Sequence, residues 1–151
     1  MNKAFIREAE APSQGHCPQC QSLGQPVPSA TLRERLGAEL GRGMSEAGYF
    51  CAYPRCEVAY FDLYGRVVLA ESLGHPIYPK DPRAPVCPCF GLTLEDIEAD
   101  VREGSPRRVR QLLADSRTPR ARCGALSATG RCCVAEVQRL YLKLLADYQR
   151  P

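Results

Sequence analysis

Nine cysteines in a chain of 151 residues constrain the fold more than any other feature. Four lie between residues 17 and 56, and five lie between residues 87 and 133. A chain of this length forms one domain or two small ones, and small domains lack a large hydrophobic core. Disulfides or metal ions commonly stabilise such domains, so each group of cysteines is expected to hold one part of the fold together.

The N-terminal sequence favours metal binding over disulfides. It lacks the apolar run and the small-residue cleavage site of a secretory signal. No stretch approaches the ~18 apolar residues of a membrane span, so no membrane insertion is expected. We therefore expect a cytoplasmic protein, in which thiols stay reduced and clustered cysteines bind metal. The odd number of cysteines also fits a complete disulfide framework poorly.

The first group of cysteines has the spacing of a zinc site. Zn²⁺ takes four thiolates tetrahedrally at about 2.3 Å, and a Cys-x-x-Cys turn directs two sulfurs at one point. Cys17 and Cys20 have that spacing, and Cys51 and Cys56 lie where two aromatic, β-prone segments join. We predict a closed, structural zinc site formed by these four, with His16 outside the coordination. The alternatives are buried free thiols or one redox pair.

The remaining pattern predicts an α+β fold in two halves. In the first, Thr31 and Glu34 have capping-box spacing for a helix ending at Gly41, followed by a small antiparallel sheet over residues 48–70. In the second, three helices are expected over 93–103, 105–115 and 131–148. The expected organisation is a flexible tail (1–14), a zinc-binding subdomain with a β-hairpin and helix (15–80), a linker (81–86) and a three-helix subdomain that carries the second group of cysteines (87–151).

The second group of cysteines favours an iron–sulfur cluster. Cys87 and Cys89 are separated by one residue. Such a pair cannot easily bind one zinc ion in a relaxed tetrahedral geometry, but it can supply two thiolates to one edge of a [2Fe–2S] cluster. Cys123 and then Cys132-Cys133 follow, the double cysteine at the start of an expected helix. The amides and dipole of a helix N-terminus oppose the negative charge of such a cluster. Adjacent side chains at a helix start diverge, so only one of Cys132 and Cys133 is expected to bind.

Several motifs carry a resemblance to a known family. They are Cys17-Pro-x-Cys20, the string Tyr-Phe-Cys-x-x-Pro-x-Cys-x-Val-x-Tyr-Phe at 49–61, Cys87-x-Cys89-Phe-Gly, and Gly130-x-Cys132-Cys133. Residues 15–145 resemble the N-terminal domain of CopZ-type copper chaperones, and the second half resembles bacterioferritin-associated-ferredoxin-like [2Fe–2S] domains. The resemblance implies Cys133 as the fourth cluster ligand. The loop Ser127-Ala-Thr-Gly130 departs from the family's Asn-Pro-Ser-Gly, and the sequence lacks the family's Met-x-Cys-x-x-Cys copper site.

The resemblance implies electron transfer linked to copper or other soft-metal homeostasis. The expected partners are a redox protein or a metal-transport protein, and the copper ion itself. The net charge of +3 is too small to indicate nucleic-acid binding. No catalytic motif is found, so enzyme activity is not expected, although a metal-ion reductase with a partner electron donor stays open. The alternative function is a zinc-ribbon-type module that binds protein or nucleic acid through two structural zinc sites.

Three further groups of side chains have structural interpretations. We expect a small core around the zinc hairpin from Tyr49, Tyr60, Phe61 and Tyr64. Four acids are expected in the first turns of a helix, where they suit the helix dipole and need no catalytic role. They are Glu95, Asp96, Glu98 and Asp100. Six arginines are expected to form a solvated helix face and loop, in preference to a basic docking face. They are Arg107, Arg108, Arg110, Arg117, Arg120 and Arg122.

Overall fold

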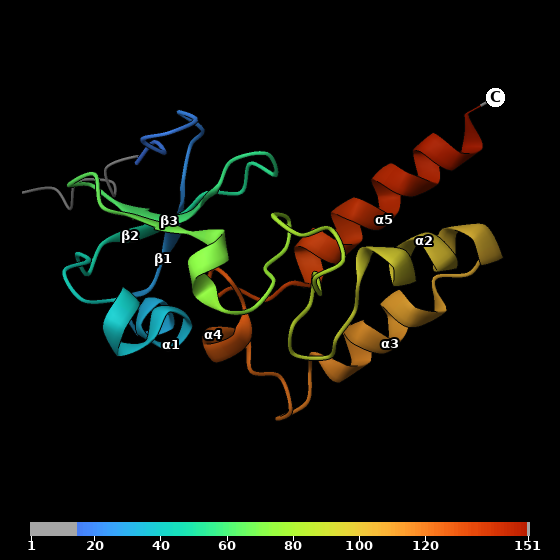
Figure 1. The fold of residues 1–151 in the computed structure, drawn as a ribbon. Helices are drawn as coiled ribbons and strands as arrows, with labels where there is room; N and C mark the ends of the chain where they lie inside the picture. Colours follow the sequence, from blue (N-terminus) through green and yellow to red (C-terminus); the bar gives the residue numbers. More distant parts are fainter. Residues whose placement is uncertain (1–14, 151) are drawn as a thin grey trace, which may run out of the picture.

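A four-stranded antiparallel sheet forms the first half of the chain in the computed structural model, which describes residues 15–150 (Figure 1). The predicted tail at 1–14 lies outside the described residues. The strands pair in chain order. They are β1 Gln25–Val27, β2 Gly48–Phe50, β3 Val58–Asp62 and β4 Val67–Leu69. The predicted α+β class and antiparallel sheet are confirmed, although the sequence analysis did not include β1.

The central strand β3 is buried along its whole length because both faces of the sheet are covered. On one side Tyr60 and Phe50 pack with residues of the first helix, such as Leu32 and Leu36. On the other side Phe61 stacks on Tyr49, with ring centroids 5.4 Å apart, beside the first cysteine group. Tyr64 was expected in this core, but it is 85% exposed because it lies in the β3–β4 turn.

Helix α1 (Ser29–Leu40) follows β1 and ends at Gly41, as predicted. The predicted capping box is wrong. Pro28 is the N-cap residue, and the Thr31 hydroxyl donates to the carbonyl of Gly124, 2.8 Å away. The Thr31 hydroxyl therefore donates to a distant carbonyl and does not accept from an amide of its own helix. The short 3₁₀-helix η1 (Ala70–Leu73) then leads into the proline-containing segment between the halves.

Helices α2 (Leu94–Glu103), α3 (Arg107–Asp115) and α5 (Val134–Gln149) pack together at the other end of the molecule (Figure 1). Their shared core contains Ile97, Val109, Leu112, Val137 and Leu140. Thr93 and Asp96 form a capping box, and Gly104 ends α2 with a left-handed φ of 73°. The starts of α3 and α5 fall later than predicted, at Arg107 and Val134. The short helix α4 (Cys123–Leu126) was not predicted.

Asp100 was expected among the acids that suit the dipole at the start of a helix, but it lies in the second half of α2 and is buried. Its side chain is fully buried, and its two carboxylate oxygens accept from the Arg108 guanidinium and the Val109 amide, both at 2.9 Å. Arg108 also bonds Glu103. The carboxylate thus ties the end of α2 to the start of α3.

Two hydrogen bonds join the sheet half to the segment that carries the later cysteines. The first is the bond from Thr31 to Gly124, and in the second the Tyr60 hydroxyl donates to the carbonyl of Ala128. Within residues 15–150, no helix has the length and apolarity needed to cross a bilayer.

Candidate metal centres

The first four cysteines converge on a single point. The Sγ atoms of Cys17 and Cys56 lie 3.8 Å apart, those of Cys20 and Cys51 lie 3.6 Å apart, and all four lie within 4.8 Å of one another. A tetrahedral zinc ion with bonds of about 2.3 Å requires thiolates about 3.8 Å apart. The four side chains therefore fit a Zn²⁺ ion with four sulfur ligands.

Tight turns place these sulfurs. The Cys17 amide donates to the Ser22 carbonyl and the Gln21 amide donates to the Cys17 carbonyl, both at 2.9 Å, which closes the Cys-x-x-Cys loop. The Cys51 amide donates to the Ala59 carbonyl at 2.8 Å, so the second pair lies where β2 and β3 meet. His16 forms a backbone bridge with Leu23 and is not among the converging ligands.

The four thiols have unequal surroundings. Burial raises the pKa of Cys51 to about 12. Burial also opposes ionisation of Cys20, but hydrogen bonds with Ser22 outweigh it and lower the pKa to about 6. Near Cys51 lies the Lys80 ammonium, 3.5 Å from its Sγ and 2.6 Å from the carbonyl of Tyr53. Lys80 was missed from the sequence because a single lysine among prolines carries no ligand-like pattern.

The second group of cysteines gathers between the helices. The Sγ atoms of Cys89 and Cys123 lie 3.9 Å apart. Cys87 is fully buried, Cys133 is partly buried in the helical core, and Cys132 is exposed. In the described part of the chain, these thiols do not form a group as compact as the first one.

The neighbouring thiols of Cys87 and Cys133 have separated pKa values. The interaction with Cys133 lowers the pKa of Cys87 to about 6, against the effect of burial, with further help from the amides of Phe90 and Cys89. The interaction with Cys87, together with burial, raises the pKa of Cys133. Burial and the nearby Cys89 and Cys132 raise the pKa of Cys123 to about 12. Cys87 therefore neighbours Cys133, and Cys123 neighbours both Cys89 and Cys132.

Helix starts and a tight turn surround the second group of thiols. Cys123 begins α4, and Cys133 is the N-cap residue of α5. Gly91, with a φ of 72°, turns the chain after Cys89, so that Cys87 and Leu92 form a backbone bridge. Unpaired amides at helix starts and in tight turns suit a negatively charged group.

Comparisons with known proteins agree with this geometry for the first half. Residues 14–73 match the family model of the CopZ zinc binding domain. The fold is similar to the X-ray structure of the N-terminal domain of CopZ from Archaeoglobus fulgidus, with a TM-score of 0.66. Sequence identity is 23%, and the match covers 83% of this chain and 97% of that domain. No curated protein matches the chain.

These matches support a CopZ-type zinc-binding domain over residues 14–73. Together with the converging Cys17, Cys20, Cys51 and Cys56 thiols, they support Zn²⁺ as the metal of the first half. The chain is thus a metal-binding protein with a CopZ-like N-terminal fold.

Proposed function

We propose that this chain carries a structural zinc ion and a [2Fe–2S] cluster and transfers electrons in the handling of copper or another soft metal. The observation that carries the proposal is the pairing of Cys87 with Cys133 and of Cys89 with Cys123 beside the first turns of α4 and α5. Neighbouring thiols spread over two positions suit two iron atoms, whereas four thiols that converge on one point suit one zinc ion.

In this proposal, Cys17, Cys20, Cys51 and Cys56 hold the zinc ion. The site has four sulfur ligands and no open position, so its role is to stabilise the sheet half. Phe61 and Tyr49 cover it, and Lys80 offsets part of the negative charge of four thiolates. The zinc-binding subdomain spans residues 15–80, and residues 81–86 link it to the second subdomain.

Cys87, Cys89, Cys123 and Cys133 hold the cluster, which would accept and return one electron when bound. The chain's own residues set its surroundings. The amides of Cys89 and Phe90 stabilise negative charge on the Cys87 sulfur, and the helical core keeps Cys87 and Cys133 away from water. Cys132 is exposed and stays outside the coordination.

One electron is the amount that converts Cu²⁺ to Cu⁺, so a copper ion fits as the substrate of such a protein. The electron would come from a redox partner, since the sequence has no motif for a nicotinamide donor. A metal-transport protein would then take the reduced ion. We place this activity in the cytoplasm, where the thiols stay reduced.

A second candidate is an interaction module with two structural zinc ions. The observation that favours this second candidate is the close contact of Cys89 with Cys123, because two neighbouring thiols can also bind zinc. Anaerobic purification followed by metal analysis and a visible spectrum separates the two. We expect one zinc and two iron atoms per chain, with absorption between about 400 and 600 nm that dithionite bleaches. A colourless protein with two zinc ions would contradict the proposal.

A further inference from the structure

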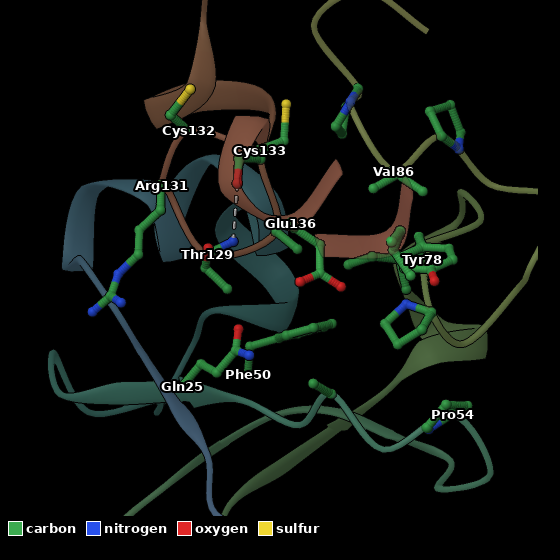
Figure 2. Close-up of a pocket in the computed structure, with 18 of the residues that line it drawn as sticks. Gln25, Phe50, Pro54, Tyr78, Val86, Thr129, Arg131, Cys132, Cys133 and Glu136 are labelled. Atoms are coloured by element: carbon green, nitrogen blue, oxygen red, sulfur yellow. Dashed lines mark hydrogen bonds between the residues drawn. The ribbon is translucent and has the colours of Figure 1, made fainter. Parts of the chain in front are cut away.

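A cavity of about 680 Å³ lies between the sheet and the start of α5. Figure 2 shows Phe50 and Gln25 on the sheet side, Thr129 and Glu136 on the α5 side, and Tyr78 and Val86 from the proline-containing segment. The sulfurs of Cys132 and Cys133 point away from Glu136 and Phe50 (Figure 2). Cys132 and Cys133 also line the cavity, so it adjoins the second group of thiols, and its volume is within the range of small-molecule sites.

The described wall of this cavity is rich in positive charge. Four cationic side chains line it, and Glu136 is the single carboxylate. Arg139 already bonds both oxygens of Glu136, at 2.9 and 2.7 Å, so that carboxylate is neutralised. The other cations are Arg35, Arg131 and Lys143.

Among these cations, Arg35 gives the strongest indication of a bound anion, because the described groups that contact its guanidinium are neutral. Its Nη2 lies 2.6 Å from Nε2 of His75, and its Nε is buried with no hydrogen-bond partner. Burial and the charge of Arg35 lower the pKa of His75, so this imidazole is neutral at neutral pH. Within residues 15–150, Arg35 forms no ion pair with a carboxylate. A partly buried cation without a counter-charge is costly, and a bound anion removes that cost.

The rest of the wall is apolar. Phe50, Ile77, Tyr78, Val86 and Leu140 line the cavity, and Phe50 and Ile77 belong to the core of the sheet half. Inorganic ions would leave these side chains uncovered, whereas a molecule with an aromatic or aliphatic body would contact them. Small-molecule sites commonly combine an apolar wall with a few polar groups that fix orientation.

We propose that this cavity binds a small organic carboxylate, with its head group at Arg35 and its apolar body between Phe50 and Tyr78. This site goes beyond the proposed electron transfer and does not require the cluster. Guanidinium and carboxylate groups match in charge and geometry, which makes Arg35 the residue that selects for the head group.

Benzoate is a suitable probe, with benzyl alcohol as its neutral counterpart and inorganic phosphate as an anion without an apolar body. We would titrate each into the zinc-loaded full chain and follow the amide resonances by NMR. Benzoate should give saturable shifts at residues 127–129, His75 and Tyr78, and the other two should bind more weakly. Equal binding of benzyl alcohol or phosphate, or the lack of saturable benzoate binding at millimolar concentration, would overturn the proposal.

Variants of helix α1 test the role of Arg35 directly. Arg35→Gln should weaken benzoate binding about tenfold, as expected for the loss of a charged hydrogen bond, and Arg35→Lys should keep most of it. Arg33→Gln removes an exposed arginine from the same helix and should have no effect. Zinc content would show that each variant is folded. If Arg35→Gln and Arg33→Gln bind benzoate equally well, the assignment is wrong.

Discussion

The ammonium of Lys80 lies 3.5 Å from the Sγ of Cys51 and donates to it. Lys80 comes from the segment that connects the two halves of the chain, whereas Cys51 follows a strand of the sheet. A second bond from Lys80 to the Tyr53 carbonyl, 2.6 Å long, fixes its position. Four thiolates around Zn²⁺ carry excess negative charge, so a donor at one sulfur stabilises that thiolate and keeps the zinc ion bound.

Replacing Lys80 should therefore loosen the zinc site. We expect Lys80→Met to release zinc to a competing chelator about tenfold faster than the wild-type chain, which is the lower end of typical outer-shell effects. A colorimetric chelator assay measures this rate. Lys143→Met is the control, because Lys143 is an exposed lysine on α5, outside the zinc cluster. If both variants release zinc at the wild-type rate, the Lys80 contact has no role in metal retention.

Cys133 and Cys132 should respond differently to removal. Cys133→Ala takes away a thiol that neighbours Cys87 within the helical core, whereas Cys132→Ala changes an exposed side chain. After anaerobic purification, we expect Cys133→Ala to lose most of its iron and visible absorption, and Cys132→Ala to keep both. Zinc content should stay the same in the two proteins. The opposite pattern would make Cys132 the cluster ligand.

The buried carboxylate of Asp100 should contribute strongly to stability. Asp100→Ala leaves the Val109 amide without its acceptor and removes one partner of Arg108, so we expect a loss of about 2–4 kcal/mol in the free energy of unfolding. Glu103→Ala removes a solvent-exposed partner of Arg107 and Arg108 and should cost much less stability than Asp100→Ala. Urea denaturation of both variants gives the comparison, and equal losses would contradict the role given to Asp100.

His75 should make the folded state sensitive to acid. Burial and the charge of Arg35 lower its pKa in the folded chain, so the unfolded chain binds more protons as the pH falls. Stability should therefore decrease once the pH falls below the unfolded value of about 6.5, until the folded pKa is reached. Denaturation curves at several pH values should show a smaller decrease for His75→Gln than for the wild-type chain.

Local signals made much of the fold predictable. Thr93, Asp96 and Gly104 determine the two ends of α2 through contacts within a few residues, and aromatic segments with a turn determine the hairpin that carries Cys51 and Cys56. The convergence of the first four cysteines follows from their spacing because each pair lies in a tight turn.

Other features depend on contacts between distant segments, which spacing does not reveal. Thr31 bonds a carbonyl 93 residues away instead of capping its own helix. Asp100 is buried because α3 folds back on it. The cavity is formed by side chains from several separate stretches of the chain, so neither Arg35 nor Phe50 could be assigned to a site from the sequence.

The hydrogen bonds from Thr31 and Tyr60 to the segment between Cys123 and Cys133 bear on how the protein matures. Both donors belong to the sheet half, and both acceptors belong to the segment between Cys123 and Cys133. If the chain carries both proposed groups, filling the zinc site would favour the conformation of this segment that the cluster site requires. By reciprocity, a bound cluster would strengthen zinc retention, so each site would be easier to fill once the other is occupied.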